Sequence, residues 1–247
     1  MHPIVLQTLC VLITAHLIGD FVLQDKQLVK RKKSSFGWMI LHSFIHAALA
    51  YLLLGCWTGW LVPLVVFAGH LLIDLVKSRM KRDNLFAFLL DQILHLVVIV
   101  LLVAFYLLPK GVAPLWFTLY PRSALVVMVI LSAVILLTQA GGILIGHFVR
   151  PFQEQISIYY RPNKRGLEEG GKTIGWLERL LIFVFVLTGQ YAGVGFLIAA
   201  KSIFRFGELK DSENRKEAEY IIIGTFASFL FALLVSLLTR RILSVYN

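Results

Sequence analysis

The sequence predicts an all-α membrane protein, a polytopic bundle of six to seven helices. Of its 247 residues, 58% are hydrophobic and only 15% are charged, whereas a soluble globular domain carries about a quarter charged residues. The mean hydropathy of the chain is +0.80. Apolar runs of about 20 residues, the length that crosses a bilayer as a helix, also recur along the chain. These runs cover approximately residues 3–23, 36–54, 57–76, 85–108, 123–149, 174–200 and 220–239.

The chain is strongly basic, with a net charge of +10, but the distribution of its charge argues against a nucleic-acid partner. The Lys and Arg residues lie in short groups between the apolar runs, as they do in the cytoplasmic loops of membrane proteins. We therefore expect membrane lipid as a partner and no nucleic acid, and the sequence leaves the oligomeric state open. The two cysteines, Cys10 and Cys56, lack the spacing of metal ligands and are interpreted as packing residues.

The basic groups also predict the orientation of the chain. They follow the first, third and fifth runs, within residues 26–33, 77–82 and 150–172, whereas the turn at residues 55–59 has none. Because Lys and Arg are enriched on the cytoplasmic side, we expect the N-terminus outside and the three basic segments in the cytoplasm. Residues 150–173 are interpreted as a cytoplasmic loop.

The sixth apolar run conflicts with this orientation. Residues 201–216 are again basic, yet a single crossing by residues 174–200 would place them outside. Gly189, Gly193 and Gly195 interrupt the run near its middle. We expect a re-entrant segment or a broken pair of helices that starts and ends at the cytoplasmic face, which is tolerated where the backbone is buried in protein. The alternative is one plain seventh span that violates the charge rule.

Histidine and aspartate residues recur four positions apart inside the first four apolar runs. Residues i and i+4 share one helix face, so each pair points in one direction. In the predicted topology all four pairs lie in the cytoplasmic half of their helices, so they are expected to meet at one level. The pairs are His16 and Asp20, His42 and His46, His70 and Asp74, and Asp91 and His95.

The same four runs contain an internal repeat. HLIGD at residues 16–20 is similar to HLLID at residues 70–74. Each is followed by basic residues and a returning helix with a second pair, HSFIH at 42–46 or DQILH at 91–95. Two parallel hairpins of this kind predict a pseudo-symmetric four-helix core with two facing half-sites. The predicted parts are residues 1–110, the His/Asp-rich membrane core, and residues 111–247, the C-terminal membrane helices with the loop at 150–173.

Carboxylates inside apolar helices need a cationic partner, because each costs roughly 2.5–3.5 kcal/mol on insertion scales. A metal, protons, or nearby Lys and His could offset this cost. One pair alone is more simply explained by contacts between helices, but four pairs at one level favour metal or proton chemistry. Imidazole and carboxylate suit Zn, Mn or Fe, and the set exceeds what one four-coordinate zinc needs, so we expect one or two divalent ions. The predicted metal ligands are His16, Asp20, His42, His46, His70, Asp74 and His95.

Further polar residues near the predicted inner face are assigned supporting roles. We expect Asp91 or Glu178 to act as the catalytic base. The residues expected to contact substrate or to hydrogen-bond beside the site are Lys77, Lys201, Arg205, Gln24 and Gln92. The structural alternative is that the basic residues anchor the chain at the cytoplasmic face and that Glu178 forms an ion pair.

The motifs resemble a known family. HLIGDFVLQ, HLLIDLVK and the later histidine pairs are similar to a bacterial multi-pass membrane family described as a domain of unknown function, with an N-terminal HxxxDFxxQ motif. The resemblance covers about the first hundred residues and implies the bacterial inner membrane; IGWLER and AAKSIFRF are similar to an extension in longer members. The His/Asp-rich helices also distantly resemble the membrane-bound metal-dependent hydrolases, which implies metal-dependent hydrolysis.

Three functions are compatible with these features. The leading hypothesis is a metal-dependent hydrolase that acts at the cytoplasmic leaflet on a lipid or lipid-linked phospho- or acyl-ester. The first alternative is a transporter of divalent cations or protons, but the outer halves of the four helices are almost entirely apolar. The second alternative is a di-iron lipid oxidase, although such enzymes use more histidines and fewer carboxylates.

Overall fold

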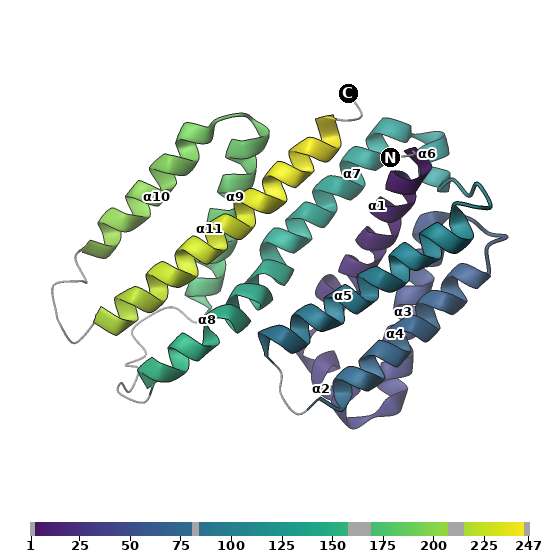
Figure 1. Ribbon diagram of the computed structural model, residues 1–247, viewed down its shortest axis with the longest axis horizontal. Coiled ribbons are helices and arrows are strands. Elements are labelled where there is room, and N and C mark those ends of the chain that lie inside the picture. Colours follow the sequence, from purple (N-terminus) through teal and green to yellow (C-terminus); the bar gives the residue numbers. More distant parts are fainter. Residues whose placement is uncertain (1–2, 81–83, 158–168, 207–214, 245–247) are drawn as a thin grey trace. The chain divides into compact units, whose positions relative to one another are not determined.

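The protein is helical throughout the part that the structure describes. In the computed structural model, residues 3–80, 84–157, 169–206 and 215–244 are described, and they form helices with short connections and no strand (Figure 1). Six of these helices are long and apolar enough to cross a membrane: Ile4–Val22, Phe36–Leu54, Leu61–Ser78, Leu85–Leu107, Pro121–Gln155 and Ala218–Ser244. The predicted all-α, multi-pass membrane architecture is therefore confirmed.

The chain divides into two compact units, residues 1–135 and residues 136–245. The first unit holds the segments in which the histidine and aspartate pairs lie. Its elements are α1 (Pro3–Leu17), the π-helical turn η1 (Ile18–Val22), α2 (Lys26–Ser34), α3 (Phe36–Leu54), α4 (Leu61–Ser78), α5 (Leu85–Leu102), the π-helical turn η2 (Val103–Leu107), α6 (Leu115–Leu119) and α7 (Pro121–Ile135).

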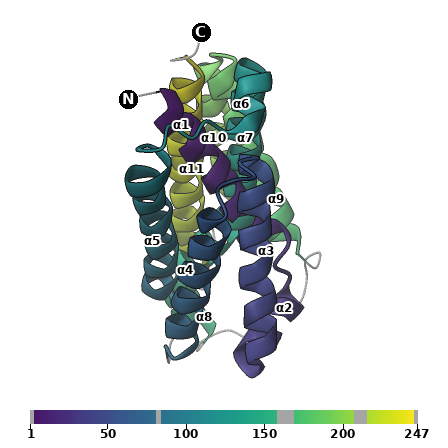
Figure 2. The same ribbon diagram turned by 90° about the vertical axis from the view of Figure 1, so that its right-hand side faces the viewer.

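Four helices of the first unit pack in a closed ring. α1 contacts α3, α3 contacts α4, α4 contacts α5, and α5 returns to α1. Figure 2 shows α3, α4 and α5 side by side. α7 packs against α1, where the hydroxyl of Thr14 lies 2.8 Å from that of Ser132. These are the four helices that the repeat predicted, and their pairs of polar residues face the inside of the ring.

Local sequence signals explain where the helices of this unit begin and end. α3 ends at Gly55, whose φ of +67° suits a residue without a side chain. Asn84 caps α5 by accepting a hydrogen bond from the backbone N–H of Ala87 at 2.9 Å. Asp25 caps α2 in the same way through Leu28 at 2.6 Å. The basic residues after the first run, expected in a loop, therefore form a helix.

The end of the first span is π-helical rather than α-helical. π-helical turns insert an extra residue into a helix and are frequent at functional sites. Here η1 carries Gly19 and Asp20. A Cβ atom at Gly19 would overlap the imidazole ring of His46, so the absence of a side chain at Gly19 lets α3 approach closely.

The second unit continues the helix that α7 begins. Its elements are the π-helical turn η3 (Leu136–Ala140), α8 (Gly141–Ser157), α9 (Gly170–Leu187), α10 (Tyr191–Phe206) and α11 (Arg215–Ser244). α8 extends beyond Arg150 and α9 begins before Thr173, so helices occupy both ends of the segment expected to be a loop. Residues 158–168 lie outside the described residues.

The sixth apolar run is a helical hairpin and not one span. α9 and α10 pack against each other and run in opposite directions (Figure 1). The chain reverses at Gly189, whose φ is +77°, a conformation that glycine adopts without the steric cost of a side chain. The alternative of a single seventh span is wrong. The chain leaves the hairpin at the end from which it entered.

Two charged side chains of α9 are accommodated inside the second unit. Glu178 accepts a hydrogen bond from Nζ of Lys201 on α10 at 2.6 Å. Arg179 is buried and donates through Nε to the carbonyl of Leu137 and through Nη1 to the hydroxyl of Ser228 at 3.0 Å. Leu137 belongs to η3, where the π-helical turn changes the pattern of carbonyl bonding. Arg179 thus ties α9 to η3 and α11.

Candidate metal centre

Five imidazole rings cluster inside the helical ring of the first unit. The ring centroids of His46 and His70 lie 3.7 Å apart, those of His70 and His95 lie 4.2 Å apart, and those of His42 and His46 lie 4.6 Å apart. The fifth ring, that of His16, is stacked against His95 with a centroid distance of 4.9 Å. Rings from four separate helices therefore lie together in one buried space. This agrees with the expectation that the four pairs of polar residues meet at one level.

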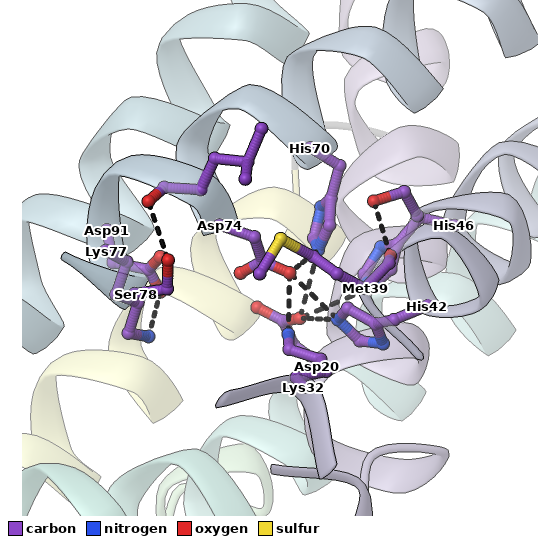
Figure 3. Close-up of polar contacts among 12 residues, drawn as sticks. Asp20, Lys32, Met39, His42, His46, His70, Asp74, Lys77, Ser78 and Asp91 are labelled. Carbon is purple, nitrogen blue, oxygen red and sulfur yellow. Dashed lines mark hydrogen bonds and ion pairs between the residues drawn. The ribbon is translucent and has the colours of Figure 1, made fainter. Parts of the chain in front are cut away.

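Asp20 contacts three of these imidazoles, those of His42, His46 and His70, and Figure 3 shows these residues together. Its Oδ1 atom lies 3.2 Å from Nε2 of His42, 3.2 Å from Nε2 of His46 and 3.6 Å from Nε2 of His70. Ligands of a tetrahedral zinc ion lie about 2.0–2.2 Å from the metal and so about 3.3–3.6 Å from one another. The contacts of Asp20 match this spacing, and one ligand atom from each of the four residues lies within 4.8 Å of all the others.

The hydrogen bonding of these imidazoles also fits a cation. Nε2 of His46 and Nε2 of His70 are buried and have no hydrogen-bond partner. The 3.2 Å contact of His46 with Asp20 lacks hydrogen-bond geometry, so proximity alone does not satisfy the ring nitrogen. Buried polar atoms without partners are rare and costly in native proteins. A divalent ion bound by His42, His46, His70 and Asp20 would satisfy them.

The second carboxylate oxygen of Asp20 faces a different group of residues. Oδ2 lies 3.6 Å from Nε2 of His16 and accepts a hydrogen bond from Nε2 of Gln92 at 3.1 Å. His16, Asp20 and His95 form a second set of three ligand atoms within 4.8 Å of one another. Gln92, expected near the site, thus holds Asp20 directly.

Asp74 and Asp91 are bound by lysines. Nζ of Lys32 lies 2.6 Å from Oδ2 of Asp74, and Nζ of Lys77 lies 2.7 Å from Oδ2 of Asp91. Asp74 lies further from its nearest imidazole than Asp20 does, with 3.7 Å between Oδ2 of Asp74 and Nε2 of His70. The two lysines offset the cost of burying these carboxylates. Lys77, expected to contact substrate, binds Asp91 in this structure.

Two residues that shape the site were not predicted from the sequence. Lys32 lies in the basic segment that follows the first apolar run. This segment is helical, and the N-cap residue Asp25 is the sequence signal for that helix. The sequence signal for the role of Gly19 is a difference between the two repeats, because HLIGD has glycine where HLLID has Ile73. The small residue marks the point where His46 comes close to the backbone of η1.

Four of the predicted site residues lie in the second unit, in a connection of the first unit, or outside the described residues. Glu178 and Lys201 belong to the second unit and pair with each other. Gln24 lies in the connection between η1 and α2. The side chain of Arg205 falls outside the part of the chain that the structure describes.

A small cavity adjoins the cluster. Its volume is about 20 Å³, which is room for about one water molecule. Four imidazoles form its polar side and small or branched apolar residues form the rest. The lining residues are His16, His46, His70, His95, Leu12, Ala15, Ala50, Val66, Val98 and Ile99.

No curated protein and no solved structure significantly matches the chain. A family model does match, and it covers residues 8–122. The matched segment contains all five clustered histidines together with Asp20, Asp74 and Asp91, and it agrees with the resemblance seen in the sequence motifs. Residues 8–122, which hold the candidate metal centre, thus match the model of the family described as protein of unknown function DUF3307.

Proposed function

We propose that the protein is a membrane-embedded, divalent-metal-dependent hydrolase that acts at the cytoplasmic leaflet on a lipid or lipid-linked phospho- or acyl-ester. One observation carries the proposal. Oδ1 of Asp20 lies 3.2 Å from Nε2 of both His42 and His46, and 3.6 Å from Nε2 of His70. Side chains from η1, α3 and α4 meet at the spacing of ligands around one cation.

The chemistry of the donors supports a catalytic rather than a purely structural ion. Imidazole and carboxylate suit Zn, Mn or Fe, and neither cysteine belongs to the set of donors. A bound divalent ion would polarise a phosphoryl or acyl oxygen and bring the pKa of a water molecule toward neutrality. The residues of the chain would hold the ion, exclude bulk water and move the proton.

Asp91 is the best placed proton acceptor. Its Oδ2 atom is held by Lys77 at 2.7 Å and by the amide of Gln92 at 3.1 Å. Its Oδ1 atom is buried without a hydrogen-bond partner and lies 3.8 Å from Nδ1 of His95. One oxygen is therefore fixed in position while the other is free to accept a proton, as a general base requires.

The surroundings of the centre support a lipid substrate. The cavity beside the imidazoles is walled by apolar side chains such as Leu12, Val66 and Ile99. Lys32 comes from the basic helix α2 and reaches Asp74 within the cluster. Apolar side chains beside the imidazoles, in a unit that also carries a basic helix, suit a molecule with an acyl chain and an anionic head. The same apolar wall gives little support to a path for ions across the membrane.

Metal content of the purified protein tests the proposal. We expect the wild-type protein in mild detergent to retain Zn, Mn or Fe by mass spectrometry, and His46→Ala to lose it because Nε2 of His46 belongs to the ligand set. His147→Ala is the matched control, since His147 lies on α8 outside this set. Chelation should abolish hydrolysis of ester or phosphoester lipids in mixed micelles, and metal should restore it.

Three outcomes would overturn the hydrolase. Iron with a visible chromophore and oxygen consumption would favour the lipid oxidase. Protein without bound metal that conducts protons or divalent cations in liposomes would favour the transporter. Equal metal content in His46→Ala and wild type would remove the centre on which the proposal rests.

A further inference from the structure

The first ligand set raises a question about reactivity. Asp20, His42, His46 and His70 would fill all four positions around a tetrahedral ion, whereas catalytic zinc sites keep one position open. We propose that a second divalent cation binds between His16, Asp20 and His95, with the Asp20 carboxylate bridging the two ions. The inference rests on the proposed function, because it needs the first ion to be present.

The carboxylate of Asp20 is oriented for bridging. Oδ1 faces His42, His46 and His70, as described above, and Oδ2 faces His16 at 3.6 Å. Each oxygen thus belongs to a different ligand set. Gln92 holds Oδ2 in this direction through a 3.1 Å hydrogen bond. Carboxylates that bridge two ions are a common feature of dimetal centres in helical bundles.

The hydrogen bonding of His95 prepares one of its ring nitrogens for a metal. Nδ1 lies 2.9 Å from the backbone carbonyl of Asp91. Since a carbonyl only accepts, Nδ1 must carry the proton and donate it, which leaves Nε2 of the neutral ring with a lone pair. Nε2 is buried and has no hydrogen-bond partner. Metal-binding histidines characteristically donate their other nitrogen to a carbonyl or carboxylate in this way.

His16 completes the second set. Its Nε2 atom lies 3.3 Å from Oε1 of Gln92, so binding an ion would exchange one weak hydrogen bond for a coordinate bond. The rings of His16 and His95 are stacked at 4.9 Å and come from α1 and α5. The second ion would therefore join the first and last helices of the ring.

The second site would have the open positions that the first lacks. Among the described residues, three side chains supply its ligand atoms, and two of them, His16 and His95, line the cavity of about 20 Å³. Asp74 and Asp91 are paired with lysines, so Asp20 is the carboxylate left to balance two divalent ions. The centre would be strongly positive, which favours an anionic phosphoryl group over a neutral acyl ester as the substrate.

Metal counting and electron paramagnetic resonance of the Mn²⁺-loaded protein test the inference. We expect the wild-type protein to bind about two ions per chain and to give a spin-coupled spectrum, because one carboxylate bridges them. His16→Ala and His95→Ala should each bind about one ion and give an uncoupled six-line spectrum. His147→Ala should resemble the wild type. Inorganic phosphate should alter the coupled spectrum but leave the spectrum of His95→Ala unchanged.

The outcomes separate this inference from the proposed function. A wild-type protein that binds one uncoupled ion, lost in His46→Ala but kept in His95→Ala, would overturn the second site and leave the first intact. Failure of the wild type to bind any ion would overturn both. A coupled spectrum that phosphate does not alter would overturn the phosphoryl preference. Because the wild-type spectrum alone reports a bridged pair, misfolding of one variant does not decide the result.

Discussion

Three carboxylates lie in the apolar helices of the first unit, those of Asp20, Asp74 and Asp91, and they differ in their partners. Asp74 is paired with Lys32, and Asp91 with Lys77. Among the described residues, Asp20 contacts imidazoles and one amide but no lysine or arginine. Charge balance therefore favours a cation at Asp20 and not at the other two.

This difference predicts opposite results for two matched substitutions. Asp20→Asn should abolish metal binding, because it removes the negative charge that both ligand sets share. Asp74→Asn should retain most of the metal, since its carboxylate already belongs to Lys32. Metal content by mass spectrometry compares the two variants. Loss of metal in Asp74→Asn alone would assign the first site to Asp74 in place of Asp20.

The pair of Lys32 and Asp74 makes a separate prediction about stability. Both side chains are nearly buried, with 11% and 6% of their surfaces exposed. Lys32→Met would leave the Asp74 carboxylate without its partner and should lower the free energy of unfolding by about 3 kcal/mol. The double variant Lys32→Met with Asp74→Asn should recover most of this loss. Denaturant unfolding in detergent measures it, and an equal loss in both variants would mean that Lys32 acts by packing alone.

At the scale of the element, the π-helical turn η1 sets the geometry of the centre. It carries Asp20, and its Gly19 lets the ring of His46 lie against the backbone. A regular α-helix with a larger residue at this point would push α3 away from α1. The close packing of α3 against the first span and the position of His46 in the ligand set therefore both depend on Gly19.

Gly19→Ala tests this dependence. The new methyl group must displace His46, so metal affinity should fall by about 10–100-fold, the usual effect of disturbing residues that orient ligands. Gly146→Ala on α8 is the control, because a Cβ atom there meets nothing within 4 Å. Metal titration measures both. Unchanged affinity in Gly19→Ala would show that the ring of His46 can move without cost.

At the scale of the whole molecule, the hairpin of α9 and α10 makes a prediction about topology. Because the chain enters and leaves the hairpin at the same end, Gln153 before it and Lys216 after it should lie on one side of the membrane. Thr58, in the turn between α3 and α4, should lie on the other side. Cysteines at these positions, in a chain with Cys10 and Cys56 replaced by serine, can be labelled with an impermeant maleimide. Labelling of positions 153 and 216 from opposite sides would contradict the hairpin.

Features that depend on residues close together in the sequence could be predicted, whereas features that depend on residues far apart in the sequence could not. Helix faces depend on residues four positions apart, so the convergence of His16, His46 and His70 was predictable. The partner of Asp74 was not, because Lys32 is 42 positions away and only tertiary packing brings it near. The bonding of Arg179 to η3 likewise depends on packing between helices, since 42 positions separate Arg179 from Leu137. Long-range contacts of this kind leave no periodic pattern in the local sequence.

Closure of the ring by α5 against α1 has a consequence for assembly. Helices in a bilayer insert individually and associate afterwards. The first donor set needs η1, α3 and α4, and the second needs α1, η1 and α5, so both sets are complete only when all four helices of the ring have met. A bound ion would therefore stabilise the associated state selectively. Metal binding would therefore favour the correctly associated four-helix bundle over incomplete or mispaired assemblies.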